Sequence, residues 1–404
     1  MSESTPKLVV HPREGTPDLI NTPAALAGAV EQLSRSRAPV GVDVERAAGF
    51  RYSDRAYLIQ IRRDDCGTFL IDADALTHLD DLSVALGNAV WILHAADQDL
   101  KSLAMAGMEV PSLFDTEIAA QLLGYDRIGL ASVCERALGL TLDKDHQNSD
   151  WSVRPLPHAW LRYAALDVEL LGELYRVLGN ALYDAGRWEW AEAEFEYIRT
   201  RPPKPIDPNR WRTIPGAGKI RHRRNLAVLD ELWHTRERIA EERDIAPTRL
   251  IRNQTLVAIA LHPPRNKRSL LSFQEMRRSR TRVHVDAWMS AISCGLSRSN
   301  ADLPPLKRPL MPGELPKVQQ WRASHPEAHA RLQKIRAAVR KCADDLEIDP
   351  TVMLEPRVQR IIAWKNIAYR GEELFDYLTR LGVRQWQIEV AGSAIDRAVA
   401  RFSH

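Results

Sequence analysis

Residues 39–46, with the sequence PVGVDVER, are predicted to form a buried β-strand that carries two acids, Asp43 and Glu45. Side chains two residues apart on a strand project from the same face, so both carboxylates point in one direction. Burying an ionised carboxylate costs roughly several kcal/mol unless it is paired or bound to a metal. No lysine lies within the strand to pair with these acids. The alternative is that the strand ends at Val42 and both acids are solvated, so partners from elsewhere in the chain would decide between the two.

Charge is divided unevenly between the two halves of the chain. Residues 1–198 contain 17 Lys and Arg against 31 Asp and Glu, a net charge of −14. Residues 199–404 contain 39 against 22, a net charge of +17. A strongly basic half favours a polyanionic partner such as a nucleic acid. The alternative is that the two halves simply neutralise each other.

The cysteines and the N-terminal segment indicate the cellular compartment. Cys66, Cys134, Cys294 and Cys342 are far apart and form no CxxC pair, which predicts reduced, buried thiols. The first residues lack the apolar core of a signal peptide, and no run of about 18 apolar residues occurs. We therefore expect a cytoplasmic protein without a membrane span, and we expect a monomer.

The first 200 residues are predicted to form an α/β domain. A helix that begins after Thr22 precedes the opening strand, and β-rich runs at 56–63 and 68–73 follow it as a three-stranded meander. A further short strand is predicted at 90–94. The later segments are predicted to be helical: 99–106, 115–123, 130–138, 157–182 and 187–198. This order predicts a mixed sheet flanked by helices.

The rest of the chain is predicted to be almost entirely helical. A proline-rich basic linker spans 201–209. Beyond it, the sequence ERDIAPT at 242–248 recurs as DLEIDPT at 345–351, an offset of 103 residues. A repeat of this length indicates a duplicated small domain. A second proline-rich linker at 297–316 separates the copies, so we expect domains at 1–200, 210–296 and 317–404.

Three acidic or aromatic residues elsewhere in the chain could form a site together with the two acids of the opening strand. Asp99 lies at the start of a predicted helix, and Tyr163 and Asp167 lie four residues apart on one face of another. Each alone has an ordinary explanation in helix capping, solvation or a surface hydrogen bond. Together they would place four carboxylates near one sheet edge, where mutual repulsion calls for cations among them. The four are Asp43, Glu45, Asp99 and Asp167.

Such a set of hard oxygen ligands favours Mg²⁺ or Mn²⁺. Two such ions ~4 Å apart stabilise the attacking and leaving oxygens of an in-line phosphoryl displacement. The hydroxyl of Tyr163 could hold the attacking water. Because the ordinary pKa of tyrosine is ~10, an orienting role suits it better than that of a base at neutral pH.

Three motifs of the chain resemble those of the DEDDy 3′→5′ exonucleases and, within them, the bacterial ribonuclease D family. The motifs are VDVE at 42–45, His94 with Asp99–Leu100, and Tyr163 with Asp167. Supporting matches lie at 114–116, 142–144, 149–151 and 154–156, whereas residues 145–148 depart from the family's pattern. The resemblance implies a ribonuclease H-like exonuclease domain. The two helical repeats resemble HRDC domains, which are nucleic-acid-binding bundles shared with RecQ-type helicases.

The resemblance also implies roles for the site residues. Asp43, Glu45 and Asp167 would bind the metal that activates water, Asp43 would bridge to a second metal, and Asp99 would support that one. Tyr163 would position the water. The implied reaction is stepwise hydrolysis of RNA from its 3′ end, which releases nucleoside 5′-monophosphates, with tRNA precursors as substrates. The alternatives are a DNA-directed 3′→5′ exonuclease and a non-catalytic RNA-binding protein that retains the fold.

Two basic stretches in the second half are predicted to bind RNA phosphates. Residues 199–224 hold nine Lys and Arg with one acid, and residues 265–284 hold seven with one acid. Trp211 and Phe273 are nearby candidates for base stacking. The alternative is a solvated face with aromatic residues in the core. The candidate phosphate contacts are Arg212, Lys219, Arg221, Arg223, Arg224, Arg265, Lys267, Arg268, Arg277 and Arg278.

Overall fold

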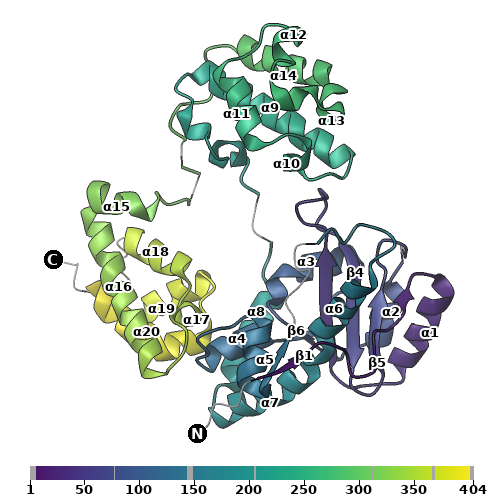
Figure 1. Cartoon of the computed structure of the whole chain (residues 1–404). Helices are drawn as coiled ribbons and strands as arrows, with labels where there is room; N and C mark the ends of the chain where they lie inside the picture. Colours follow the sequence, from purple (N-terminus) through teal and green to yellow (C-terminus); the bar gives the residue numbers. More distant parts are fainter. Residues whose placement is uncertain are drawn as a thin grey trace.

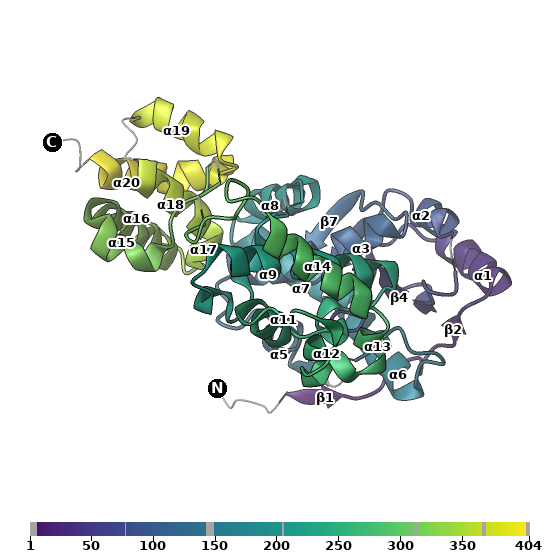
Figure 2. The same ribbon diagram turned by 90° about the horizontal axis from the view of Figure 1, so that it is seen from above.

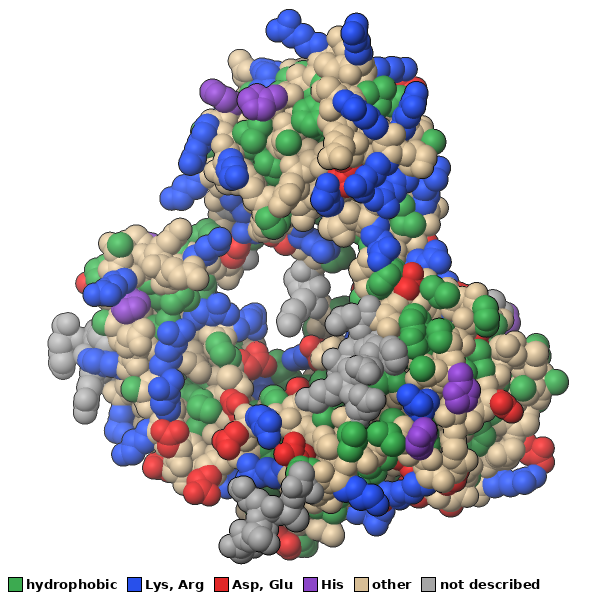
Figure 3. Space-filling view, in the orientation of Figure 1, with side chains coloured by type: hydrophobic (Ala, Val, Ile, Leu, Met, Phe, Trp, Pro, Cys, Tyr) green, Lys and Arg blue, Asp and Glu red, His purple; other side chains and the backbone are tan. Residues whose placement is uncertain are grey.

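The computed structural model of the chain describes residues 6–76, 78–142, 149–203, 206–308, 310–311, 313–365 and 369–400. An α/β domain and two helical domains are arranged around a central opening (Figures 1 and 3). Seen from above, the first helical domain lies over the α/β domain and the second lies at one end, beside α8 (Trp188–Thr200; Figure 2). Residues 143–148, which include most of one predicted motif and the predicted departure, lie outside the described residues.

The core of the α/β domain is a six-stranded sheet of order β2-β5-β4-β3-β6-β7. Strands β3, β4 and β5 form the antiparallel meander, and β6 and β7 continue the sheet in parallel, so the predicted mixed sheet is confirmed. Strands β2 and β7 were not predicted, because β2 has only two residues and β7 ends in Asp115, which has the signature of a helix cap. The strands are β2 (Leu19–Ile20), β3 (Val40–Arg46), β4 (Ala56–Arg63), β5 (Gly67–Ile71), β6 (Val90–Leu93) and β7 (Ser112–Asp115). A separate parallel pair joins β1 (Lys7–Val9) to β8 (Leu140–Leu142).

Strand β3 is the opening strand, and it lies between β4 and β6. Val40, Val42 and Val44 are buried in the main core. Since side chains alternate along a strand, Asp43 and Glu45 project from the face opposite these valines. Helix α6 (His158–Glu169) packs across β3, β4 and β5. The predicted strand therefore does not end at Val42, and its acids face the helix that carries the predicted tyrosine.

Helices surround the sheet, mostly where they were predicted. Helix α1 (Pro23–Ser34) begins at the Thr22 cap with Pro23 in its first turn. The single helix predicted at 157–182 is wrong, because the structure breaks it at Leu170 into α6 and α7 (Leu171–Asp184). Gly172 follows the break by two residues, and Leu170 and Leu171 at the break are both buried in the core. The others are α2 (Asp80–Leu86), α3 (Leu100–Met105), α4 (Thr116–Leu122), α5 (Leu130–Leu138) and α8.

The first helical domain has a hydrophobic core of its own. Its long helices α9 (Arg223–Glu242) and α14 (Val285–Ser297) pack against each other. Between and before them lie η2 (Arg210–Thr213), η3 (Ala217–Lys219), α10 (Pro247–Leu250), α11 (Asn253–Leu261), α12 (Lys267–Leu270), η4 (Gln274–Arg277) and α13 (Ser279–Arg282).

The second helical domain shares one continuous hydrophobic core with the α/β domain. Trp386 stacks on Trp190 of α8 with ring centroids 4.7 Å apart, and both Trp386 and Arg384 hydrogen-bond to the buried carboxylate of Glu194. Its helices are α15 (Val318–Ser324), α16 (Pro326–Asp345), α17 (Pro350–Met353), α18 (Pro356–Lys365), α19 (Gly371–Arg380) and α20 (Gln385–Ala400). This domain is therefore fixed to the α/β domain through apolar packing and a buried ion pair.

The repeated sequence forms the same docking corner in both helical domains. At its start, Asp244 and Glu347 have left-handed backbones, with φ of 44° and 52°, directly after α9 and α16. Two residues later, the N–H of Ala246 donates to the carbonyl of Phe50, and the N–H of Asp349 donates to that of Gln121. Each repeat thus uses this corner to contact the α/β domain, which explains why the pattern recurs.

Two expectations from composition can be compared with the structure. All four cysteines are free, but only Cys134 is buried as predicted; Cys66 and Cys342 are half-buried and Cys294, on α14, is exposed. Among the described helices, none is long and apolar enough to cross a membrane.

Candidate active site

The structure brings three of the predicted acids together. Asp43 and Glu45 project from β3, and Asp167 projects from α6, which packs on that strand. One carboxylate oxygen of each lies within 4.8 Å of the others. Glu45 is buried, and Asp43 and Asp167 are half-buried. Three oxygen donors at this separation could surround a single cation.

Asp99 lies beside this group, at the start of α3. Its side chain makes no capping hydrogen bond, so it remains free to face the site. Arg46, the last residue of β3, lies 3.5 Å from the Asp99 carboxylate and also donates to the carbonyl of Gln98 at 2.6 Å. The sequence showed no lysine in the opening strand to pair with its acids, but Arg46 at the end of that strand is a basic partner of Asp99. The strand pairing shifts register between Glu45 and Arg46, and the arginine reaches across to the neighbouring helix start.

The electrostatics of the group favour a bound cation. Burial raises the pKa of Asp43 to about 6, and burial together with the charge of Asp43 raises the pKa of Asp99 to about 8. Burial and then the neighbouring carboxylates hold the pKa of Glu45 and of Asp167 well above their usual range. Ionising all four without a counter-charge is costly. The donor set, all carboxylate oxygen, fits a hard divalent ion such as Mg²⁺ or Mn²⁺.

We expect the metal-free protein to lose stability as the pH rises from about 6.5 to 8.5. A carboxyl with a raised folded-state pKa is stabilising while protonated, and this contribution is lost as the pH rises through that pKa. His94, whose pKa burial lowers to about 4, has the opposite slope, but only below its ordinary value of 6.5. Above that pH the acids, Asp99 above all, control the slope. Thermal unfolding in EDTA across this range measures it.

Added Mg²⁺ should reverse this loss, and more strongly at pH 8.5 than at 6.5. Saturation at ~100 times Kd would add about 2.7 kcal/mol, which is roughly 5–10 °C in Tm for a domain of this size. Asp99→Asn is the matched variant, since it removes the group whose pKa is about 8 and should flatten the slope. A metal-free Tm that rises with pH over this interval would contradict the assignment.

Tyr163 lies on α6 one turn before Asp167, and its hydroxyl hydrogen-bonds to that carboxylate. Its ring is buried at 7% exposure and lies 6.4 Å, centre to centre, from the ring of Trp151. Burial raises the pKa of Tyr163 above its ordinary value, so the hydroxyl stays protonated. A protonated phenol can donate one hydrogen bond and accept others, which is what orienting a water requires.

Asp115 positions the segment that presents Asp99. Its carboxylate accepts hydrogen bonds from the N–H groups of Glu117 and Ile118, so Asp115 is the N-cap of α4, the helix predicted at 115–123. The same carboxylate also accepts from the N–H groups of Ala95 and Ala96, at 3.1 and 2.8 Å. One buried acid therefore joins the end of β7 to the turn that leads into α3.

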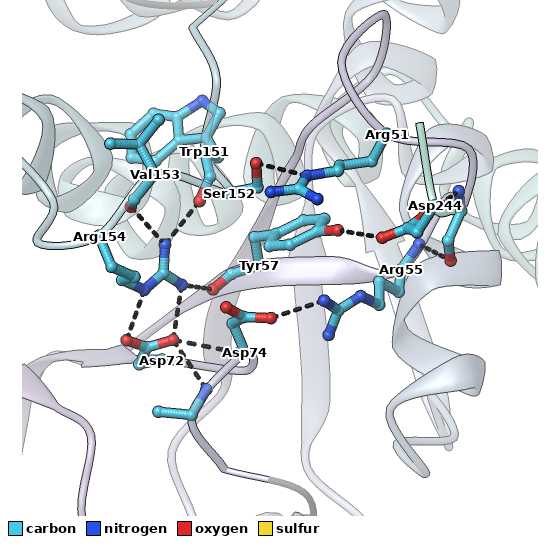
Figure 4. A network of polar contacts seen from close by, with 12 residues as sticks. Arg51, Arg55, Tyr57, Asp72, Asp74, Trp151, Ser152, Val153, Arg154 and Asp244 are labelled. Atoms are coloured by element: carbon cyan, nitrogen blue, oxygen red, sulfur yellow. Dashed lines mark hydrogen bonds and ion pairs between the residues drawn. The ribbon is translucent and has the colours of Figure 1, made fainter. Parts of the chain in front are cut away.

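Arg154 fixes the loop that precedes α6 (Figure 4). Its guanidinium makes two hydrogen bonds to the buried carboxylate of Asp72, at 2.6 and 2.8 Å. It also donates to the carbonyls of Trp151 and Tyr57. These contacts tie the loop to β4 and to the end of β5. Because Tyr163 follows on the next helix, Arg154 indirectly sets its position.

Sequence reasoning missed Gln60 as well as Arg46. Gln60 lies on β4 directly opposite Asp43, so the two side chains share a face of the sheet. It is fully buried, yet its amide has no hydrogen-bond partner among the described residues. Such a group is expected where solvent or a ligand completes a site. A glutamine within the otherwise apolar run YLIQI was the available signal.

The predicted phosphate contacts fall into two groups. Arg212, Arg223, Arg224 and Arg277 donate to backbone carbonyls of their own domain and the segment after it, and Lys267 and Arg278 lie near acids. The other predicted contacts are exposed and have no such partner among the described residues. They are Lys219, Arg221, Arg265 and Arg268. Trp211 is 3% exposed and lies in the core, so it cannot stack on bases, and Phe273 also packs against that core.

Fold and site together define a 3′–5′ exonuclease, with acids on the central strand and a tyrosine on the helix that covers it. The family model described as "3'-5' exonuclease" matches residues 17–183. The HRDC domain model matches residues 225–292, whereas residues 314–399 match one described as "3' to 5' exonuclease C-terminal domain". The HRDC resemblance of the second repeat therefore stays a prediction.

Relatives define the family more closely, and solved structures share the fold. The chain is 30% identical to ribonuclease D of Nitrobacter hamburgensis over 345 residues, which cover 82% of this chain and 87% of that one. It is 27% identical to ribonuclease D of Gluconacetobacter diazotrophicus, and the match covers 90% of this chain and 93% of that one. The chain belongs to the ribonuclease D family. A crystal structure of a protein from Bifidobacterium adolescentis is 34% identical with a TM-score of 0.88 and covers 98% of this chain and 100% of its own. Escherichia coli RNase D, 24% identical, shares the fold with a TM-score of 0.67, with 96% and 99% covered.

Proposed function

We propose that this protein, a 3′–5′ exoribonuclease, uses two divalent metal ions to shorten structured RNAs such as tRNA precursors and releases nucleoside 5′-monophosphates. The observation that carries the proposal is the meeting of Asp43, Glu45 and Asp167 within 4.8 Å, with Asp99 and Tyr163 beside them. A dead enzyme that kept only the fold would be free to lose any of these side chains, and all five are present.

The bound cations would neutralise the negative charge that develops on the attacking and leaving oxygens. Asp43, Glu45 and Asp167 would hold one of them, and Asp43 and Asp99 would hold the other. Arg46, which lies 3.5 Å from Asp99, limits the net negative charge on that side. Tyr163 would donate to or accept from the water that attacks the phosphorus, with its ring held by Trp151. Burial of these groups excludes bulk water and strengthens each contact.

The basic helical half supports RNA as the substrate. An α/β half with a net charge of −14 repels a polyanion, and the half with +17 holds it near the site. Among the predicted contacts, Lys219, Arg221, Arg265 and Arg268 are exposed and could bind phosphates of the RNA. Such contacts bind phosphates of any sequence, which suits an enzyme that removes one nucleotide after another.

The test is incubation with a 3′-extended tRNA, single-stranded RNA and single-stranded DNA, each with Mg²⁺ or with EDTA. We expect Mg²⁺-dependent shortening of the RNAs one nucleotide at a time and 5′-monophosphate products. Equal or faster degradation of DNA would make the protein a DNA-directed exonuclease. Binding without any shortening would make it a non-catalytic RNA-binding protein.

A further inference from the structure

A basic pocket lies where the first helical domain contacts the α/β domain. Its volume is about 600 Å³, within the roughly 300–1,000 Å³ of ligand sites. Its lining includes Arg51 of the α/β domain and Arg243, Arg249 and Arg280 of the helical domain, with Asp150 as the one acid. Figure 3 shows Lys and Arg side chains gathered at the junction of these two domains. No arginine of this pocket was among the predicted RNA contacts.

Two of the four arginines are held in place by hydrogen bonds, and none of the four is neutralised by an acid among the described residues. Arg51 donates through Nε to the Ser152 hydroxyl at 2.8 Å (Figure 4), and Arg249 donates through Nε to the Gly49 carbonyl at 2.8 Å. Each bond uses one of the five donors of a guanidinium. Across the described parts of the chain, no acidic side chain lies within ion-pair distance of any of the four. Their terminal amino groups remain available to an anion.

Contacts between the domains preform the pocket. The N–H of Ala246 donates to the Phe50 carbonyl, and the Arg249 guanidinium stacks 3.8 Å from the centre of the Phe50 ring. Asp244 accepts from the N–H groups of Tyr52 and Ser53, and from the Tyr57 hydroxyl (Figure 4). The loop that carries Arg51 is thus clamped by the helical domain, and little ordering is needed before a ligand binds.

The pocket lies close to the acidic site along two paths. Arg51 lies six positions after Glu45, so their Cα atoms are at most about 20 Å apart. Asp150 on the other wall directly precedes Trp151, whose ring lies 6.4 Å from that of Tyr163. At about 3.4 Å per stacked nucleotide, a strand of about six nucleotides at most would span the distance.

We propose that this arginine pocket binds phosphates of the RNA strand on the 5′ side of the nucleotide that is being removed. The inference rests on the proposed function and adds a place where the strand is held. Guanidinium groups match phosphate oxygens in pairs. Four cations against one acid reverse the sign of the charge locally on a domain that otherwise repels RNA. The first helical domain then contributes directly to substrate binding, because three of the four arginines belong to it.

The test variant is Arg243→Gln with Arg280→Gln, because neither side chain has a bonded partner among the described residues. Arg35→Gln with Arg37→Gln, directly after α1, removes the same charge elsewhere in the chain. Binding of a fluorescent RNA of about twelve nucleotides is measured in EDTA over a series of salt concentrations. Two lost single-strand phosphate contacts should reduce the salt slope by about 1.4 and weaken binding on the order of 10- to 100-fold. Arg243→Lys with Arg280→Lys should keep the slope.

Hydrolysis supplies a second, independent readout. A dinucleotide without a 5′-phosphate has only the scissile phosphate, so its kcat and KM should be unchanged in the Gln variant. The KM of the longer RNA should rise about as much as its Kd, with little change in kcat. The thermal unfolding temperature should equal that of the control variant, which separates loss of binding from loss of domain docking.

Three results would overturn the proposal. One is a salt slope equal to that of the Arg35/Arg37 control. Another is an equal loss of dinucleotide turnover, which would place the effect at the active site. A third is loss of nucleoside 5′-monophosphate binding with unchanged binding of the longer RNA, which would make the pocket a product site. If the wild-type protein hydrolyses no substrate, the proposed function fails, but the binding series in EDTA still tests the pocket.

Discussion

Replacement of Asp43 by Asn should abolish exonuclease activity and leave RNA affinity largely intact. Asp43 lies on the central strand and is the one acid expected to touch both cations. Mutation of a residue that only hydrogen-bonds to a metal ligand already lowers metal affinity or activity by roughly 10–100-fold. For a bridging ligand we expect a loss of about 10³-fold or more in kcat. RNA binding depends on the basic half and should remain within about twofold in EDTA.

Stability distinguishes this result from unfolding. Asp43→Asn removes one of several buried charges that repel each other, so the metal-free variant should be more stable than the wild type at pH 8. The increase in Tm on addition of Mg²⁺ should shrink or vanish. Asp97→Asn is the matched control, because Asp97 is exposed and pairs with Arg201 instead. Turnover of Asp43→Asn at the wild-type rate would remove Asp43 from the site.

The second large effect is expected for Tyr163→Phe, which should slow hydrolysis by about 10²-fold, the order that follows from misplacing a reactant by 1 Å. Phenylalanine keeps the ring beside Trp151 and removes only the hydroxyl that contacts Asp167. The fold, RNA affinity and stabilisation by Mg²⁺ should therefore persist. Single-turnover kinetics at saturating RNA measure the chemical step.

Tyr183→Phe is the control for this variant. Tyr183 is 75% exposed and lies near the end of the next helix, α7, so its hydroxyl can be removed at the surface of the protein. Loss of the hydrogen bond should also raise the pKa of Asp167, because the Tyr163 hydroxyl lowers it. A variant that needs a higher pH for its residual activity would support this link. An unchanged single-turnover rate would exclude the tyrosine from the mechanism.

Much of the α/β domain could be predicted because local patterns encode it. The β-rich run at 56–63 became β4 without a shift, and the helix predicted after Thr22 begins at Pro23, with the Thr22 side chain as its cap. Strand β7 could not be predicted in the same way. It is four residues long, and its last residue, Asp115, has the stronger local signature of a helix cap.

The sequence could predict which side chains form the site, but not which residues from other segments contact them. Residue spacing placed Asp43 with Glu45 on one face and Tyr163 with Asp167 on another, since strand and helix periods are fixed. Nothing local showed that Arg46 would reach Asp99, or that Trp211 would enter the core. Both depend on which segments become neighbours after folding.

By itself, the sequence determined the acidic strand, the capped helices, the repeated sequence at 242–248 and 345–351 and the opposite charges of the two halves, because each is a property of neighbouring residues. Only the tertiary structure decided the break at Leu170, the buried amide of Gln60 opposite Asp43, and the meeting of four arginines in one pocket. Arg51 and Arg280 lie more than two hundred residues apart in the chain. Their juxtaposition follows from the docking of one domain on another, which no local pattern can specify.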